Sequence, residues 1–493
     1  MSHEPFRPGF HFSPRENWMN DPNGLVWYDG EFHLFYQYNP ERPDWGNMSW
    51  GHAVSPDLVR WTHLPIALEF TGTEYVFSGS VVVDHVNTSG LGRDGAPPMV
   101  ALYTNYDPAT KRQAQAVAWS NDRGITWQRH PDNPVLDIGS TDFRDPKVFW
   151  YEPGAYWVMV VALSVNQVIR FYRSDDLLSW TQLSEYSSPG WTDGANWECP
   201  DLFELPVEDG GSSWVLVLSI GPGGTGTWLG TTYVLGHFDG TSFIADPAHP
   251  DLRPLDHGAD YYAAVSFSDA PAGQRILMAW MNNWAYAGDI PTQEFRGAMA
   301  VPRSITLRTT EVGTQLIQKP LVLQDSGRGP SWSVSDHDLQ PGTTTVPLDG
   351  CGDQLLIRAE FAPENAERVG LHVRVGDGER TVVGYDVTTG TVYVDRRHSG
   401  QTDFHPDFAT VHTAPLTPRN GRVSLTVLVD RASVEVFGND GEAAITDQIF
   451  PRPDSTGVEL YVEGGSARAV YITVDRLTSV DQPADEHVQL RAL

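Results

Sequence analysis

The chain has 493 residues, of which 40% are hydrophobic, so it is long enough to form two domains with buried cores. Lys and Arg number 33 against 63 Asp and Glu, which gives a formal net charge of −30. This balance argues against nucleic acid or an anionic membrane surface as a partner, because both demand clustered Lys and Arg, whereas a neutral sugar is compatible with it.

The start of the chain and its cysteines bear on the cellular compartment. Residues 1–8 lack the apolar core of a signal peptide, and no stretch approaches the roughly 18 apolar residues of a membrane span. The two cysteines, Cys199 and Cys351, lie far apart in sequence, so we expect no disulfide framework. We therefore expect either a cytoplasmic protein or a secreted one whose leader has been removed, and the sequence does not separate the two.

The first two thirds of the chain repeat one pattern, in which a polar or acidic head is followed by a β-rich run. Such heads recur at roughly 60-residue intervals, which is room for four strands; they are Asp21, Ser78, Asp145, Glu198 and Asp260. Helical periodicity is scarce and turn residues break the runs, which indicates an all-β protein. The repeat predicts a five-bladed β-propeller over residues 1–322, with each headed strand innermost in its blade. A generic β-rich enzyme with recurrent hairpins is the alternative.

A second repeat lies out of phase with the first. A Ser/Asp turn leads into a strand that starts with Trp at 55–61, 120–127 and 174–180, and a degenerate copy follows at 238–243. This recurrence supports the division into blades.

The last third of the chain changes in character after Arg303. Residues 325–331 read as part of a linker over 323–346, and alternating strands follow at 354–361, 369–375, 380–387 and 422–429, with a hairpin turn at 438–441. Their spacing predicts a β-sandwich over 347–493. No acidic head next to proline occurs here, so we expect a structural or accessory role for this domain.

Three of the propeller heads are acids held in tight turns. Asp21 lies in Asn-Asp-Pro-Asn-Gly, Asp145 in Arg-Asp-Pro and Glu198 in Trp-Glu-Cys-Pro. If the headed strands surround one channel, these carboxylates converge at one end of it. Glycoside cleavage needs such a group of acids, one to attack or assist the anomeric carbon and one to protonate the leaving oxygen.

The three acidic blocks in this order resemble the signature of glycoside hydrolase family 32, the invertases, inulinases and levanases that cleave β-fructosides. Similar blocks run from His11 to Pro302, and residues 425–437 resemble the C-terminal domain of that family, so the resemblance covers most of the chain. It implies that Asp21 is the nucleophile and Glu198 the general acid/base, while Asp145 holds fructose hydroxyls and stabilises the transition state. The residues alone do not separate the roles of Asp145 and Glu198.

The resemblance also implies the remaining residues of a fructose pocket. The matching positions are Asn20, Gln37, Trp45, Phe77, Ser78, Arg144 and Trp284. The stretch 282–297 is similar to the inulinase and levanase branch of the family. Ser49 is a departure, because many relatives carry His there, and it leaves the preference for donor or acceptor open.

Taken with the resemblance, these residues predict a retaining β-fructosidase that removes terminal fructose from sucrose or fructans. A transfructosylase is an alternative, since it differs only in what intercepts the fructosyl-enzyme, and a non-catalytic carbohydrate-binding propeller is another. We expect no metal and no cofactor, because the spacing of His11, His33, His52 and His63 fits no compact ligand set and two carboxyls suffice. Linkage preference and oligomeric state stay open.

Overall fold

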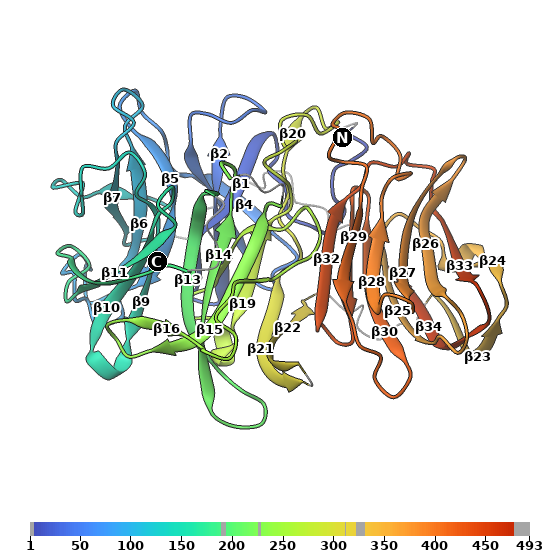
Figure 1. Ribbon diagram of the computed structural model, residues 1–493. Coiled ribbons are helices and arrows are strands. Elements are labelled where there is room, and N and C mark those ends of the chain that lie inside the picture. The colour runs from blue at the N-terminus through green and yellow to red at the C-terminus, as the bar shows by residue number, and fades with distance from the viewer. Residues whose placement is uncertain (1–3, 189–193, 225–227, 311, 322–330, 478–493) are drawn as a thin grey trace.

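The computed structural model describes residues 4–188, 194–224, 228–310, 312–321 and 331–477. Its strands form seven sheets, five in a propeller and two in a sandwich beside it (Figure 1). The helices in these residues are short 3-10 turns, η1 Glu152–Gly154, η2 Pro271–Gly273 and η3 Leu348–Gly350. None of them has the length and apolar character that crossing a bilayer requires. The all-β architecture predicted from the sequence is confirmed.

Each propeller blade is built around four antiparallel strands. Blade 1 contains β1 Asn17–Tyr28, β2 Glu31–Asn39, β3 Ser49–Ser55 and β4 Thr62–Leu68, with the short parallel strand β20 Phe295–Arg296 beside β1. Blade 2 contains β5 Tyr75–Val83, β6 Met99–Tyr106, β7 Gln113–Ser120 and β8 Gln128–Arg129. Blade 3 contains β9 Arg144–Tyr151, β10 Tyr156–Leu163, β11 Val168–Ser174 and β12 Thr181–Tyr186.

The last two blades complete the propeller. Blade 4 contains β13 Trp197–Pro206, β14 Ser212–Ile220, β15 Gly230–Phe238, β16 Phe243–Ala245 and the short β17 Arg253–Pro254. Blade 5 contains β18 Tyr262–Ser266, β19 Ile276–Trp280, β21 Arg303–Thr310 and β22 Gly313–Pro320. The inner strands β1, β5, β9, β13 and β18 contact one another in that order, and β18 returns to β1. This closed ring is the arrangement that the repeated heads predict.

The inner strands share a local irregularity near their heads. The pairing register shifts between Met19 and Pro22 in β1, between Val76 and Gly79 in β5, and between Glu198 and Asp201 in β13. The register of β9 also shifts, between Arg144 and Lys147. At these bulges Asp145 has a φ of 66° and Cys199 a φ of 49°, both in the left-handed region. A bulge turns a side chain away from the regular alternation of the strand, so it can aim a carboxylate along the channel.

The Ser/Asp turns of the second repeat join the third and fourth strands of blades 1 to 3. In each, the indole N–H of the following Trp donates to a turn carbonyl, with Trp61 bonding Leu58, Trp127 bonding Gly124 and Trp180 bonding Leu177. The strands themselves begin one residue after each Trp. These tryptophans therefore have a structural role, since each one closes its own turn.

The C-terminal domain is a sandwich of two six-stranded sheets. One has the order β23 Trp332–Leu339, β34 Ala467–Arg476, β25 Leu355–Ala362, β30 Val423–Asp430, β31 Ser433–Gly438 and β32 Ala443–Gln448. The other has the order β24 Gly342–Thr345, β33 Gly457–Glu463, β26 Arg368–Gly376, β27 Glu379–Asp386, β28 Thr391–Asp395 and β29 Val411–Pro415. Apolar residues of both sheets, among them Ile357 and Leu371, share one core.

The linker expected at 323–346 needs correction. Strands β23 and β24 fall within it and pair with β34 and β33, so they belong to the sandwich. Both are edge strands with mostly exposed side chains, and apart from Trp332 and Val334 they lack the alternating apolar residues that identified the other strands. Residues 323–330 of the expected linker lie outside the described residues.

A buried polar network joins the two domains. Arg303 of β21 bonds Asp256 and, in the sandwich, Glu435, each at 2.9 Å. His11 bridges Asp430 and Glu435 at 2.8 and 2.7 Å. Asp260, expected to face the channel with the other heads, instead accepts a hydrogen bond from Arg396 of the sandwich at 2.6 Å.

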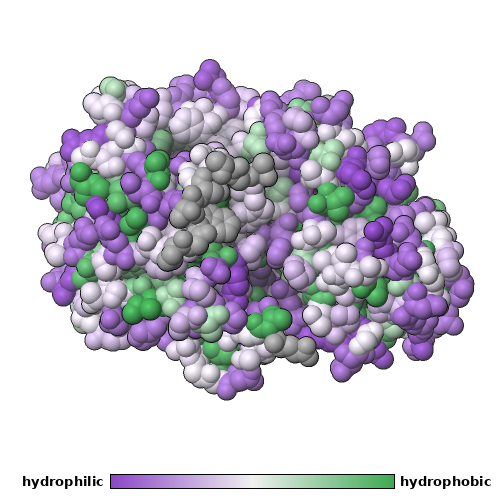
Figure 2. Space-filling view, in the orientation of Figure 1, coloured by the Kyte–Doolittle hydropathy of each residue, from purple (hydrophilic) through white to green (hydrophobic). Residues whose placement is uncertain are grey.

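Hydrophilic side chains dominate the molecular surface shown in Figure 2, and hydrophobic side chains form only small groups on it.

Candidate active site

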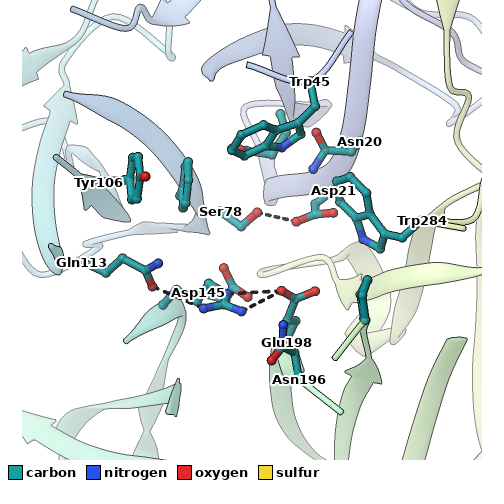
Figure 3. A pocket seen from close by; sticks show the side chains of 14 residues that line it. Asn20, Asp21, Trp45, Ser78, Tyr106, Gln113, Asp145, Asn196, Glu198 and Trp284 are labelled. Atoms are coloured by element: carbon teal, nitrogen blue, oxygen red, sulfur yellow. Dashed lines mark hydrogen bonds and ion pairs between the residues drawn. The ribbon is translucent and has the colours of Figure 1, made fainter. Parts of the chain in front are cut away.

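A cavity of about 380 Å³ lies at the head end of the inner strands (Figure 3). Every residue of the predicted site lines it: Asn20, Asp21, Gln37, Trp45, Phe77, Ser78, Arg144, Asp145, Glu198 and Trp284. They come from blades 1 to 4 and from the loop that follows β19, so the fold gathers residues far apart in sequence. Trp45, with 46% of its surface exposed, lies at the rim.

The Asp21 carboxylate has two unlike oxygens. Its Oδ2 accepts a hydrogen bond from the Ser78 hydroxyl at 2.6 Å and a weaker one from the Cys199 thiol at 3.6 Å. Its Oδ1 is buried and has no hydrogen-bond partner within the described residues. One oxygen is therefore held in place while the other is free to react.

Asp145 is fixed by backbone groups. Its own N–H donates to Thr104 Oγ1 at 2.9 Å, and its Oδ2 accepts from the N–H of Cys199, also at 2.9 Å. The Cys199 thiol lies 3.7 Å from the same oxygen. The bulge in β13 thus ties the third and fourth blades together between the acids.

Glu198 is held at both carboxylate oxygens. Arg144 Nη2 donates to Oε1 at 2.8 Å, and the Tyr262 hydroxyl donates to Oε2 in a short hydrogen bond. Arg144 also pairs with Asp142 at 2.7 Å and with Ser164 at 2.6 Å. Arg144 therefore positions Glu198, whereas the sequence places it only beside Asp145.

Burial and crowding shift the ionisation of this cluster. Burial raises the pKa of Asp21, the Ser78 hydrogen bond opposes this rise, and the nearby Glu198 charge adds to it. Burial also raises the pKa of Asp145 to about 7, against the opposing charge of Arg144. Burial raises the pKa of the Cys199 thiol, and the three carboxylates add to the shift. Unequal carboxyl environments of this kind let neighbouring acids take different roles.

Several lining residues carry no sequence signal of their own. Tyr106, Gln113, Asn196 and Pro222 complete the cavity wall. Tyr106 stacks on Phe77 with ring centroids 4.5 Å apart, and Gln113 faces it across the β6–β7 pair. Asn196 directly precedes the third acidic block, so its position in the sequence could have identified it as a site residue. Tyr106 and Gln113 lie far from any acidic block, and only the pairing of β6 with β7 brings them to the cavity.

Ser49 does not line the cavity. It is buried in β3, where its hydroxyl donates to the carbonyl of Asn47 at 3.2 Å and accepts from the N–H of Phe70 at 2.9 Å. Any effect of Ser49 on the preference for a sugar donor or sugar acceptor would therefore be indirect.

The candidate histidines of a metal site are dispersed. His33 and His52 contact each other at 3.1 Å, whereas His11 lies at the domain interface. Within the described residues no group of three or more His, Cys, Asp or Glu has a metal-binding arrangement.

Comparison with known families decides what this cavity is. The N-terminal domain model of glycosyl hydrolases family 32 matches residues 11–320, and the C-terminal model of the same family matches residues 325–476. The chain belongs to glycoside hydrolase family 32. It is a glycoside hydrolase, as the three acidic blocks suggested.

Family 32 relatives match along nearly the whole chain. A levanase from Bacillus subtilis is 44% identical, with 97% of this chain and 71% of the relative covered. An extracellular exo-inulinase from Aspergillus awamori is 38% identical, with 97% and 95% covered.

Solved family 32 structures share the fold. The crystal structure of the exo-inulinase from Aspergillus awamori superimposes with a TM-score of 0.92 at 38% identity, covering 97% of this chain and 99% of that one. A fructofuranosidase from Schwanniomyces occidentalis, complexed with fructosylnystose, gives a TM-score of 0.87 at 32% identity, with 96% and 98% covered. The five-bladed propeller with a C-terminal sandwich is therefore the family architecture.

Proposed function

We propose that this family 32 enzyme is a retaining β-fructosidase that releases terminal fructose from sucrose or fructans. The observation that carries the proposal is the convergence of Asp21, Asp145 and Glu198 in one cavity. Figure 3 shows Asp21 and Glu198 on facing sides of that cavity. A carboxylate on each side of a scissile bond is the arrangement that double-displacement glycoside cleavage uses.

In the first step Asp21 Oδ1 attacks the anomeric carbon of fructose, and the bond from that carbon to the leaving oxygen breaks. Glu198 gives its proton to the leaving oxygen, so a fructosyl ester of Asp21 and a free alcohol result. In the second step Glu198 takes a proton from water, which attacks the same carbon and regenerates Asp21. Asp145 accepts hydrogen bonds from fructose hydroxyls, while Arg144 and Tyr262 hold Glu198 in position.

The cavity walls favour a chain end. Trp45, Phe77 and Trp284 narrow a small cavity in which carboxylates and amides meet hydroxyls and rings meet C–H faces. An internal polymer residue has chain on both sides and would not fit. The relatives named levanase and exo-inulinase support fructans as substrates.

Product analysis tests the proposal. Sucrose, inulin and levan are incubated separately, and early products are separated by chromatography, with Asp21→Asn as the inactive control. We expect fructose as nearly the only early product from each fructan that is cleaved. A ladder of oligosaccharides appearing first would mean an open cleft, and no release from any substrate would favour the sugar-binding propeller.

Transfer to sugar is the second candidate, because family 32 chemistry allows an acceptor other than water. Longer oligosaccharides that accumulate at high sucrose concentration would identify a transfructosylase. We expect hydrolysis to dominate, since the similarities to a levanase and an exo-inulinase point to enzymes that degrade fructans.

We also propose that the protein acts outside the cell, as the name of the Aspergillus awamori relative states for that enzyme. The two buried, unpaired cysteines place no demand on the redox state of the compartment. Fractionation of the producing culture tests this, and activity confined to the cytoplasm would contradict it.

A further inference from the structure

A second cavity, of about 880 Å³, lies at the other end of the propeller channel. The active-site residues come from the starts of the inner strands, whereas this cavity is lined by their ends, such as Val83 of β5, Tyr151 of β9 and Glu204 of β13. Strands advance about 3.3 Å per residue, so the two cavities open toward opposite faces of the propeller.

A buried ion pair lines the inner end of the second cavity. Lys147 Nζ lies 3.3 Å from Asp201 Oδ2, and both side chains are almost fully buried. Lys147 follows Asp145 by two positions and Asp201 follows Glu198 by three, so the pair occupies the channel just beyond the catalytic acids. The second cavity is thus a separate site.

The floor of this cavity has unused hydrogen-bonding capacity. Asp201 Oδ1 is buried and has no hydrogen-bond partner among the described residues. Arg275, which lines the same floor, uses Nη1 to contact the Ser266 hydroxyl and the Phe267 carbonyl at 3.3 and 3.5 Å. A guanidinium has five N–H groups, which is more than these two contacts use. Buried polar groups left without partners are costly, and a polar ligand would satisfy them.

Aromatic rings form the walls. Phe149, Trp150 and Tyr151 at the end of β9 face the cavity together with Trp214 of β14. Phe149 and Trp214 have ring centroids 5.9 Å apart, and Trp150 and Trp214 are both partly exposed. Exposed ring faces beside donors and acceptors are the features that bind sugars in proteins.

The lining charges are of both signs and favour neither a cation nor an anion. Lys147 and Arg275 at the floor repel a cation, while Asp201, Glu204 and Asp269 disfavour an anion. At the rim, His85 and Asp269 pair with each other at 3.0 Å. What remains suited to the cavity is a neutral molecule with many hydroxyls.

We propose that this second cavity binds a neutral sugar segment of a fructan, away from the active site. The choice of fructan rests on the proposed function, since a polymer-degrading enzyme gains residence time on its substrate from a second site. Two sites on one protein raise the effective concentration of chain ends at the active site.

Equilibrium dialysis tests the proposal with short inulin and levan oligosaccharides and the Asp21→Asn protein. We expect two oligosaccharides per chain at saturation. Adding Arg275→Gln or Trp150→Ala should weaken the second site at least tenfold. The matched controls Arg308→Gln and Trp119→Ala change partly exposed residues that line neither cavity, and should keep both sites. Arg275→Gln in the otherwise unchanged enzyme should leave sucrose turnover as it was.

One oligosaccharide per chain would overturn the proposal, as would two that survive both Arg275→Gln and Trp150→Ala. Circular dichroism of each variant identifies loss of fold. If Trp150→Ala does not fold, the test rests on Arg275→Gln, which removes no large buried group. Hydrolysis by the unmodified enzyme is measured separately. Its absence would refute the proposed function, whereas the binding count alone decides this inference.

Discussion

Ser78→Ala isolates the electrostatic control of the proposed nucleophile. The Ser78 hydroxyl donates to Asp21 Oδ2 at 2.6 Å and stabilises the ionised carboxylate, so it opposes the rise in pKa that burial causes. A hydrogen bond to a charged group contributes about 1.5–3 kcal/mol. At about 1.4 kcal/mol per pKa unit, its loss should raise the pKa of Asp21 by about 1–2 units.

The assay is the pH dependence of kcat/KM for sucrose, which reports the ionisation of the free enzyme. Because Asp21 must be ionised to attack, the acidic limb should move to higher pH by about 1–2 units, treated as an apparent value of the coupled carboxyls. Ser80→Ala is the matched control, since Ser80 lies on the same strand, bonds the Pro146 carbonyl and does not line the cavity. A uniform loss of rate with an unmoved limb would refute the reasoning, because it would make Ser78 only a sugar contact.

Three further predictions concern the acid/base, the thiol and the domain interface. Glu198→Ala should slow substrates with poor leaving groups far more than activated ones, since only the former need protonation, and equal losses would count against its role. Iodoacetamide should leave activity intact at pH 8, because burial raises the pKa of the Cys199 thiol and keeps it protonated; rapid inactivation prevented by Cys199→Ser would contradict this. His11→Ala should lower the free energy of unfolding by about 3–5 kcal/mol, because it leaves buried Asp430 and Glu435 without their shared partner, and denaturant melts measure this. Burial lowers the pKa of His11, but its hydrogen bonds to these carboxylates and their charges outweigh burial and raise the pKa to about 9. The stabilisation is therefore full below pH about 6.5 and is lost as pH rises through 9. A Tm difference between wild type and variant that is constant from pH 6 to 10 would argue against it.

The propeller and its acids could be predicted because each inner strand starts with a recognisable turn. The repeat fixed the order of strands around the channel, and so the convergence of Asp21, Asp145 and Glu198. The same logic failed for Asp260, because it lies in the segment before β18, which bonds the sandwich backbone, and its carboxylate meets Arg396 across the domain interface. Sequence spacing cannot show which neighbour a blade packs against.

Other features depend on contacts that no local pattern encodes. Tyr262 reaches Glu198 only because β18 lies beside β13 in the ring. The pairing of Arg144 with Glu198 joins residues from adjacent blades, so adjacency in the sequence does not reveal it. Strands β23 and β24 were assigned to the linker because edge strands with mostly exposed side chains need little apolar alternation.

Covalent trapping tests the central claim most directly. The Glu198→Ala enzyme is incubated with a fructoside that carries an activated leaving group, then quenched, digested and analysed by mass spectrometry. The mechanism predicts one fructosyl group per chain, esterified to Asp21, because the first step proceeds without the acid while the second lacks its base. A fructosyl group on Asp145 would contradict the assignment of Asp21 as the nucleophile. So would a correctly folded Glu198→Ala enzyme that turns over the activated substrate but carries no adduct.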